Sequence, residues 1–401
     1  MPIPYWRLSS YYFFYFATLG CFIPYWNLYL KDIGFNTVQI GALSALLAGT
    51  RIIAPNLWGW IADHTGKRLR SIRLAAFFAT LIYTGFLFVH GYVWFTWITI
   101  GFSFFWNAAL PQFEAATLAH LKTQPYRYSQ IRLWGSIGFI VAVLGGGWLL
   151  DINLSTLPPQ IWSNSSFINW ISSLKPIALL PGIVLSLFFM QWLITLIVPD
   201  AHTASYSTER IGILQVLKKR GVLAFFVVCM LLQFAHAPYY VFYSIYLKQL
   251  HYSATITGGL WALGVVAEIV LFVFMRQVLQ RFPLKTILLC SIVLAIVRWL
   301  AIAWCAQYLW ALLVAQLLHA MTFGATHITA IHFVHEYFGD QHQGKGQALY
   351  NSLGMGLGGM LGSLFSGYFW DLWGATGIFS IAALSCAIAL LITSIWIGSD
   401  R

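Results

Sequence analysis

Three ionisable residues, Glu268, Arg298 and His319, lie inside long apolar stretches of the second half of the chain. If each stretch is a membrane helix, Arg298 lies about 20 Å and Glu268 about 12 Å from the same membrane surface, at 1.5 Å per residue. An extended arginine closes most of that gap, and His319 lies at a similar depth. A buried carboxylate beside such groups can gain and lose a proton, although a fixed structural ion pair would use the same residues. The spacing predicts a buried triad that couples a process to protons.

A second group of polar residues is suited to an aqueous cavity that contacts a solute. Glu114 and Arg132 lie near the same membrane surface and could pair. After residue 220, polar and aromatic side chains recur at helical spacing on one side, a pattern that packing alone also produces. The complete candidate set is Glu114, Arg132, Asn107, Gln233, His236, Tyr240, Tyr243 and His327. Arg51 has no evident partner, and we expect a structural role for it.

The histidines at positions 319, 327, 332 and 335 share one apolar stretch. At about 100° per residue, His327 lies about 80° from His319, and His332 lies on the opposite side. Scattered side chains cannot converge on a metal ion, so we predict no metal site. The sequence also has no G-x-S-x-G, P-loop or H-E-x-x-H motif. We therefore expect a protein that is not an enzyme and has no cofactor.

Long apolar helices must position these residues. The chain has 401 residues, of which 60% are hydrophobic and only 8% charged, with a mean hydropathy of +0.75. Too few charges are available to cover a soluble domain, whereas about 20 apolar residues suffice to cross a bilayer as a helix. We predict an all-α membrane protein with twelve transmembrane helices, at residues 8–30, 38–61, 71–90, 94–120, 131–150, 176–198, 221–247, 255–276, 285–305, 308–334, 346–369 and 374–397.

The basic residues fix the orientation of these helices. With the N-terminus inside, 17 of the 22 Lys and Arg residues fall in inner connections, three fall in outer ones, and Arg51 and Arg298 fall inside helices. Positive charge is retained on the cytoplasmic side during insertion, so both termini are expected in the cytoplasm. The net charge of +11 therefore reflects topology and contact with the lipid bilayer, and we expect no nucleic-acid partner.

The longest inner connection divides the helices six and six. We predict an N-terminal half at 1–198, a cytoplasmic linker at 199–220 and a C-terminal half at 221–401, with a polar outer loop at 151–175. Two helices carry small residues four apart, which permits close helix contact as static packing or as a sliding surface between the halves. These residues are Gly138, Ala142 and Gly146, and Gly354, Gly358, Gly362 and Ser366.

The connection between the second and third helices carries a signature. Gly59 allows close helix approach, Asp63 can cap a helix or pair with an arginine, Gly66 permits a turn with positive φ, and Lys67 and Arg68 follow it. This loop resembles the G-x-x-x-D-x-x-G-[RK]-[RK] signature of the major facilitator superfamily. The resemblance implies two pseudo-symmetric six-helix halves with a site between them, and a role for these five residues in conformational switching.

Several segments resemble the phenylpropionate permease branch of that superfamily more closely. They are residues 132–136 (RLWGS), 232–240 (LQFAHAPYY), 259–268 (GLWALGVVAE), 297–299 (VRW) and 316–319 (QLLH). The branch is related to lactose-permease-like proton symporters, which implies import coupled to protons with Glu268, Arg298 and His319 in coupling roles. Glu114 departs from the pattern, because an aspartate is expected there, and this places the substrate in doubt more than the mechanism.

The combined expectation is a multi-pass protein of a bacterial inner membrane that imports a small organic solute by proton symport. An aromatic or other carboxylic acid is the first candidate, because arginines with tyrosines suit an anion with an apolar body. A sugar or nucleoside comes second. The alternatives are proton-antiport efflux of drugs or metabolites and, from a different class, a receptor or scaffold that transports nothing. We expect a monomer whose partners are its substrate, protons and the lipid bilayer.

Overall fold

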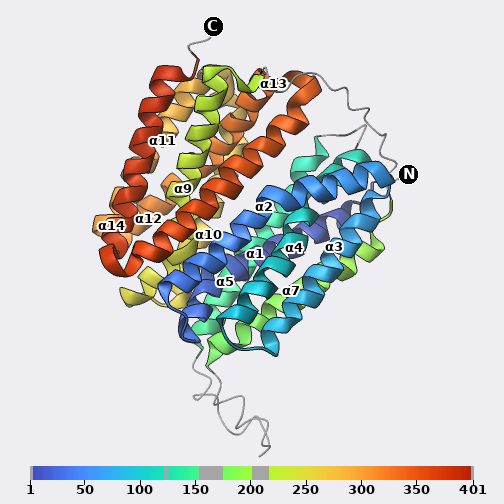
Figure 1. Cartoon of the computed structure of the whole chain (residues 1–401), viewed down its shortest axis with the longest axis vertical. Coiled ribbons are helices and arrows are strands. Elements are labelled where there is room, and N and C mark those ends of the chain that lie inside the picture. Colours follow the sequence, from blue (N-terminus) through green and yellow to red (C-terminus); the bar gives the residue numbers. More distant parts are fainter. Residues whose placement is uncertain (1–2, 122–123, 125, 153–174, 201–215, 399–401) are drawn as a thin grey trace, which may run out of the picture.

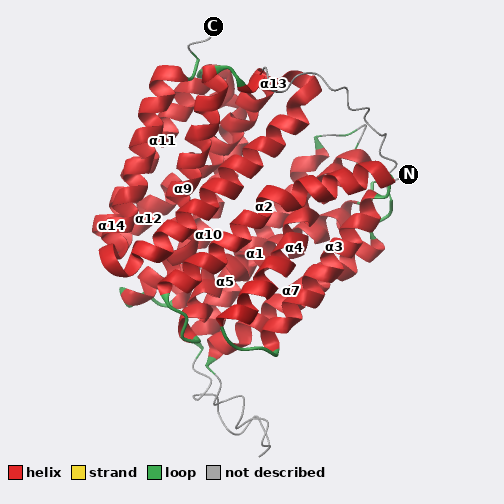
Figure 2. Cartoon of the chain, viewed as in Figure 1, coloured by secondary structure: helices red, strands yellow, loops and turns green. Residues whose placement is uncertain are grey.

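The computed structural model describes residues 3–121, 124, 126–152, 175–200 and 216–398. Across these residues the chain forms helices joined by short loops and contains no strand (Figure 2). The all-helical prediction is therefore confirmed. Most of the predicted outer loop at 151–175 and of the linker at 199–220 lies outside the described residues, so these two boundaries stay predictions.

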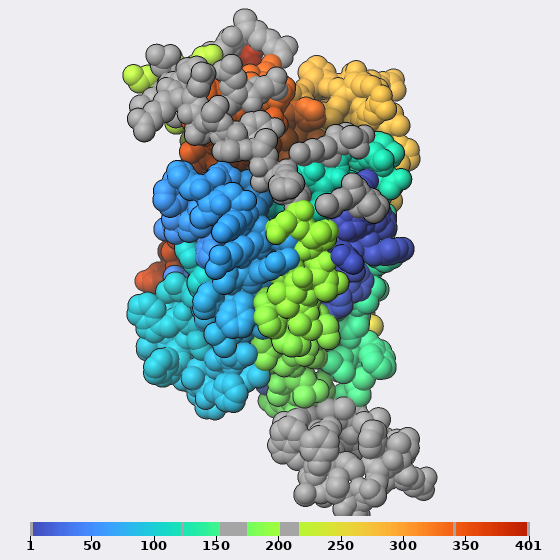
Figure 3. Space-filling view, turned by 90° about the vertical axis from the view of Figure 1, so that its right-hand side faces the viewer, coloured from blue at the N-terminus to red at the C-terminus, as the bar shows by residue number. Residues whose placement is uncertain are grey.

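The helices up to residue 197 gather on one side of the molecule and those from residue 220 onward on the other (Figure 1). The first half, here the N-half, comprises α1 (Tyr5–Asp32), α2 (Thr37–Thr65), α3 (Arg68–Tyr83), η1 (Thr84–Leu87), α4 (Tyr92–His120), α5 (Arg127–Asp151), η4 (Pro176–Leu179) and α7 (Leu180–Ile197). Helix α7 packs against both α1 and α3, and Figure 3 shows it between them on the face of the N-half.

The second half, here the C-half, contains two π-helical segments within its long helices. It comprises α9 (Arg220–Gln249), α10 (Ala254–Arg281), α11 (Leu284–Cys305), α12 (Leu309–His319), the π-helix η5 (Ala320–Ala325), α13 (Thr326–Leu349), the π-helix η6 (Tyr350–Gly358) and α14 (Gly359–Trp396). Helix α12, η5 and the part of α13 before Gly339 follow one another without a loop, and so do the rest of α13, η6 and the part of α14 before Gly374.

Among the described residues, nine helices are long and apolar enough to cross a membrane. The last of them, His342–Trp396, has 55 residues and would be about 80 Å long if straight, against a hydrocarbon core of roughly 30 Å. Gly374 interrupts it with a φ of +62°, and Gly339 interrupts α13 with a φ of +61°. These breaks lie near predicted helix boundaries, but the count of twelve crossings stays a prediction.

Local sequence explains where several helices begin and end. The Asn36 side chain accepts from the Gln39 amide at 2.9 Å while the Gln39 side chain accepts from the Asn36 amide at 3.1 Å, a capping box that starts α2. The hydroxyl of Ser253 caps α10 in the same manner, by accepting from the Ile256 amide. Gly66 ends α2 in the left-handed conformation, with a φ of +65°.

The rows of small residues pack within each half. A Cβ on Gly138 would lie 2.2 Å from the Phe13 carbonyl oxygen of α1, and one on Gly146 would meet the Tyr25 ring, also on α1. In the C-half, Gly358 and Gly362 lie against the backbone of α9. Because both partners of each contact belong to the same half, these rows are fixed packing and not a sliding surface between the halves.

The two halves are joined by other residues, at one end of the helix bundle. This is the end where α2 begins and α5 ends, and it is called the Asp151 end below. The two carboxylate oxygens of Asp151 accept from the amides of Ala254 at 2.9 Å and Thr255 at 2.7 Å, at the start of α10. On the other helix pair, the Thr37 hydroxyl donates to Asp371 at 2.6 Å, and Gly41 packs directly on Gly367.

Contacts across the halves continue past the middle of α2. The Asn56 amide donates to the Ser352 hydroxyl at 3.1 Å, and that hydroxyl donates to the Ile52 carbonyl at 3.2 Å. The described hydrogen bonds between the halves therefore run from the Asp151 end to Asn56. None of the described hydrogen bonds between the halves lies at the opposite end of the bundle. There α2 ends beside the loop that contains Asp63, and this end is called the Asp63 end below.

Two glycines of α5 allow a matched test of this packing. Gly138→Ala is expected to destabilise the protein by about 1–3 kcal/mol, because the new methyl group meets the backbone of α1. Gly145→Ala is the control, since a Cβ there meets no heavy atom within 4 Å. Thermal unfolding of the two purified variants measures the difference, and equal midpoints would contradict the fixed contact between α1 and α5.

Candidate functional site

The C-half contains a buried contact between an acid and a histidine. Glu268 on α10 and His319 at the end of α12 place Oε1 and Nε2 3.0 Å apart, with 15% and 8% of their side chains exposed. The contact is a close approach without hydrogen-bond geometry, because Glu268 Oε1 has no hydrogen-bond partner among the described residues, and neither has His319 Nδ1. The predicted proximity of Glu268 and His319 is confirmed.

Arg298 on α11 belongs to the same cluster but has other neighbours. It is fully buried, its Nη1 donates to the Thr322 hydroxyl at 3.1 Å, and its guanidinium carbon lies 4.5 Å and 4.4 Å from the ring centres of Tyr239 and Trp299. Glu268 still interacts with it electrostatically. We expected Glu268, Arg298 and His319 to form a close triad. In the structure Glu268 contacts His319, while Arg298 lies beside this pair and contacts the Thr322 hydroxyl and two aromatic rings.

The tyrosines of α9 form part of the frame around this cluster. The Tyr239 hydroxyl donates to Gln316 Oε1, and Gln316 Nε2 donates to the Tyr243 hydroxyl, both at 2.8 Å. Gln316, Tyr239 and Tyr243 are almost completely buried. Tyr243 was predicted to line the cavity, but its contacts place it in this frame. Tyr240 is partly exposed and stacks near His236, with ring centres 6.3 Å apart.

A pocket of about 350 Å³, its open mouth included, lies in the C-half between α9, η5 with α13, and η6. Three of the predicted cavity residues line it, namely Gln233, His236 and His327. His236 Nδ1 lies 2.8 Å from the Leu232 carbonyl oxygen, and His327 Nδ1 lies 2.9 Å from the Tyr350 hydroxyl. The other residues that line the pocket are Cys229, Leu232, Thr322, Phe323, Thr326, Tyr350, Gly354 and Met355.

The π-helix η5 aligns three rings beside this pocket. The rings of His319 and Phe323 are 5.4 Å apart at 7°, and those of Phe323 and His327 are 6.3 Å apart at 6°. An ideal α-helix would place His327 about 80° from His319. In η5 each hydrogen bond spans five residues, so the chain turns less per residue and the three side chains form one row. The sequence-based separation of the two histidines is corrected by this segment.

In the N-half, the predicted polar residues form two small groups. Glu114 on α4 interacts with the Tyr128 hydroxyl and with Arg132, whose guanidinium carbon lies 3.8 Å from the Phe16 ring centre. The predicted relation between Glu114 and Arg132 thus has a physical basis.

Arg51 forms the second group and does have a partner. Its Nε donates to Asn107 Oδ1 at 3.4 Å, and Asn107 Nδ2 donates to the Leu47 carbonyl and the Thr50 hydroxyl. The prediction that Arg51 lacks a partner is wrong, because the acceptor is an uncharged amide on another helix.

The charged groups of the two halves act on each other across the molecule. Arg132 of the N-half interacts electrostatically with Glu268 and His327 of the C-half. Arg51 likewise interacts with Tyr240. The Asn27 side chain also donates to the Tyr240 carbonyl at 3.4 Å. The candidate residues from both halves therefore surround one central region, with two arginines on one side and an acid with three histidines on the other.

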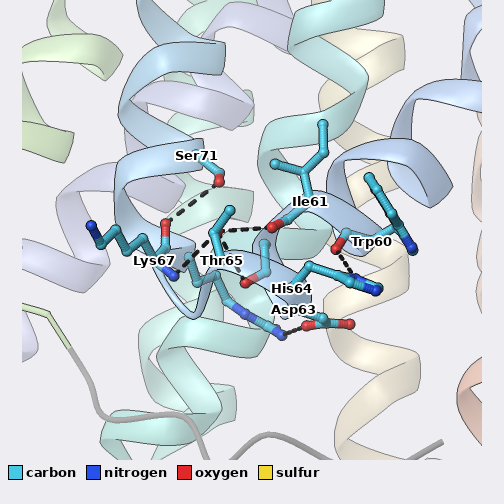
Figure 4. Close-up of polar contacts among 9 residues, drawn as sticks. Trp60, Ile61, Asp63, His64, Thr65, Lys67 and Ser71 are labelled. Carbon is cyan, nitrogen blue, oxygen red and sulfur yellow. Dashed lines mark hydrogen bonds and ion pairs between the residues drawn. The ribbon is translucent and has the colours of Figure 1, made fainter.

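The signature loop lies apart from this region. Asp63 pairs with Arg68, which directly follows Lys67, and both partners belong to the N-half (Figure 4). The Asp63 side chain is 63% exposed. Gly66 has the expected positive φ, and Gly59 packs α2 near the Gln112 side chain of α4. The predicted geometry of the loop is confirmed, while its role in switching stays a prediction.

A model described as the MFS_1 like family matches residues 5–381, nearly the whole chain. The chain belongs to this family. Over 387 residues it is 28% identical to a probable 3-phenylpropionic acid transporter of Escherichia coli (strain K12), covering 95% of each chain. It is 24% identical to a maltose permease of Geobacillus stearothermophilus, over 98% of this chain and 94% of that one. The solved structure of the nucleoside transporter NupG matches with a TM-score of 0.79 at 17% identity, covering 98% of both chains.

These matches confirm the resemblance to the major facilitator superfamily and to the phenylpropionate permease branch, and they confirm the fold. The protein is a membrane transporter of this superfamily, which favours transport over the receptor or scaffold alternative. The relatives differ in the solutes they are named for, so the family membership alone does not specify the substrate.

Three contributors to the site were not predicted from the sequence. Thr322 holds Arg298, Gln316 joins two tyrosines, and Tyr350 meets His327. Gln316 and Tyr350 are uncharged residues in apolar stretches, where amides and hydroxyls are common and carry no positional signal. Thr322 could have been found from its spacing of three after His319, which places both on one helix face.

Proposed function

We propose that this transporter is a proton-coupled symporter that imports a small organic acid, most closely an aromatic acid, bound between its two halves. The observation that carries the proposal is the buried contact of Glu268 with His319, together with the electrostatic interaction of Glu268 with Arg132 of the other half. Glu268 serves as the proton site, and Arg132 with Arg51 supplies positive charge for a carboxylate. The similarity to a probable 3-phenylpropionic acid transporter supports this substrate class.

The balance of charge explains why the two ions would travel together. An anion and one proton bound at once leave the net charge of the region unchanged. Either ion alone changes that net charge by one unit. We propose that the halves reorient only at the net charge that the empty and the doubly loaded states share, which is the condition for symport.

We further propose that the Asp63 end faces the cytoplasm of a bacterial inner membrane, with both termini on that side and the protein acting as a monomer. Basic residues of the described chain gather at this end, including Lys67, Arg68, Arg127, Lys219 and Arg281. In this orientation the hydrogen bonds at the Asp151 end close the outer side.

A sugar or nucleoside is the second substrate class, favoured by the similarity to a maltose permease and to a putative nucleoside transporter of Escherichia coli (strain K12). Efflux by proton antiport is the other alternative. Proteoliposomes with an imposed pH gradient of either sign, assayed with labelled 3-phenylpropionate, maltose and uridine, separate these cases. Accumulation of 3-phenylpropionate when the outside is acidic supports the proposal, and accumulation only of a neutral solute, or only against the reverse gradient, rejects it.

Glu268→Gln tests the proton site directly. The amide keeps the shape of a protonated carboxyl, so we expect counterflow of substrate to persist while accumulation driven by the pH gradient is lost. Glu268→Ala should be more damaging, because it leaves His319 Nε2 without its buried partner. Glu114→Gln is the matched control in the N-half. If Glu268→Gln still accumulates substrate and Glu114→Gln does not, the proton site is Glu114.

Asp63→Asn tests the signature loop. Since Asp63 pairs with Arg68 far from the central region, we expect slower transport with substrate affinity changed less than about twofold, which corresponds to under ~0.4 kcal/mol. Transport rates in proteoliposomes and equilibrium binding to purified protein give the two quantities. A large loss of affinity at a normal transport rate would show that the loop acts on binding and not on switching.

Asp151→Asn tests the opposite end. An amide cannot supply two acceptor oxygens to the Ala254 and Thr255 amides, so we expect more molecules to open at the Asp151 end. Spin labels at the exposed positions Val93 and Tyr308, one in each half near this end, should report a larger fraction of long distances. An unchanged distance distribution in Asp151→Asn would mean that these hydrogen bonds do not hold the halves together.

A further inference from the structure

Five buried polar atoms of the C-half cluster have no hydrogen-bond partner among the described residues. They are Nε and Nη2 of Arg298, Nε2 of His236, Nδ1 of His319 and Oε1 of Glu268. These side chains lie together, because Glu268 contacts His319, Arg298 interacts electrostatically with both imidazoles, and the two imidazole rings are 6.4 Å apart. Buried polar atoms are normally paired, so such a set points to a missing group.

The hydrogens on these atoms define the chemistry of that group. The Leu232 carbonyl can only accept, so His236 Nδ1 carries the hydrogen and its Nε2 bears a lone pair. A second buried positive charge beside Arg298 would be unfavourable, which keeps His236 neutral. The set therefore offers two donors from Arg298 and acceptors from His236 and Glu268. A carboxylate satisfies only the donors and an ammonium only the acceptors, whereas a hydroxyl satisfies both.

The pocket connects this cluster to the central region. His236 and Thr322, the residue that holds Arg298, both line it, and so does His327, which interacts with Arg132 across the halves. Phe323, which belongs to the row of parallel rings, supplies a flat apolar wall. The pocket thus combines a flat wall, a mouth near a cation and, at its inner end, a group of buried donors and acceptors suited to a hydroxyl.

We propose that the pocket is a subsite for a ring-bound hydroxyl, with His236 as a specificity-determining residue, so that the preferred substrate is an aromatic acid with a hydroxyl on its ring. The carboxylate lies toward Arg132, the ring lies along Phe323, and the hydroxyl donates to a histidine while it accepts from Arg298. The position of the carboxylate near Arg132 rests on the proposed function, whereas the binding of the hydroxyl by His236 and Arg298 does not.

Equilibrium binding to the purified full-length protein, without any gradient, tests the subsite with 3-(4-hydroxyphenyl)propionate and 3-phenylpropionate. We expect the hydroxylated acid to bind about tenfold more tightly, the equivalent of one net hydrogen bond. His236→Phe keeps a flat ring but removes the acceptor, so the ratio of the two affinities should fall to about one. Equal binding of the two acids to the wild type, or binding of neither, overturns the proposal, and so does a preference that survives His236→Phe.

Two glycine variants test the location and keep the proposal falsifiable if His236→Phe does not fold. A Cβ on Gly354 would sit 3.5 Å from Cys229 Cβ and 3.7 Å from the Tyr350 ring, so Gly354→Ala fits but narrows the pocket. It should weaken both acids, whereas Gly259→Ala, which meets nothing within 4 Å, should weaken neither. Unchanged binding in Gly354→Ala would place the acids elsewhere.

A third ligand, uridine, distinguishes a hydroxyl on an aromatic ring from a hydroxyl on a sugar. Uridine carries hydroxyls on a ribose, and if it binds more tightly than both acids in a His236-dependent manner, the ring-hydroxyl assignment is wrong. Failure of the proposed function appears differently, as hydroxyl-selective binding without accumulation under a pH gradient. Accumulation of both acids with equal affinity would instead reject the subsite and leave the symport proposal intact.

Discussion

The cost of placing charge in an apolar interior governs the second half of this protein. Arg298 is completely buried, and the structure provides for it with a hydroxyl and the faces of two aromatic rings more than with a carboxylate. Glu268 instead lies against His319, a residue that can be either neutral or protonated. An acid tied to a permanent cation would hold its charge firmly, whereas an acid beside an imidazole has the kind of partner that the proposed proton site requires.

This arrangement depends on the irregular helix segments. The π-helix η5 begins directly after His319 and contains both Thr322 and Phe323. Its wider turn lets Thr322 reach Arg298 while Phe323 and His327 follow His319 in one row. A second π-helix, η6, brings Tyr350 to His327 from the other side of the pocket. Irregular turns at such points reposition side chains that a regular helix would direct elsewhere, and π-bulges are frequent at functional sites for this reason.

The sequence predicted what depends on composition, periodicity and motif, and it missed what depends on local irregularity. The helical class and the depth match of Glu268 with His319 follow from apolar runs, loop charge and helix rise, whereas the family was indicated by the resemblance of the signature loop and of later segments. His327 was predicted to line the cavity, but its alignment with His319 was not, because nothing in the sequence marked the π-helix between them. The partner of Arg51 was missed for a different reason, since an uncharged asparagine on another helix gives no charge pattern to match.

The two halves contribute different chemistry to the region between them. The N-half offers permanent positive charge, with Arg132 against an aromatic ring and Arg51 against an amide. The C-half offers groups that can change protonation or act as both donor and acceptor. A solute with an anionic end and a hydroxyl end would satisfy both sides only when the halves meet around it. Binding energy of that kind is available only when the two halves are arranged around one solute, so it couples the occupancy of the site to the movement that transport requires.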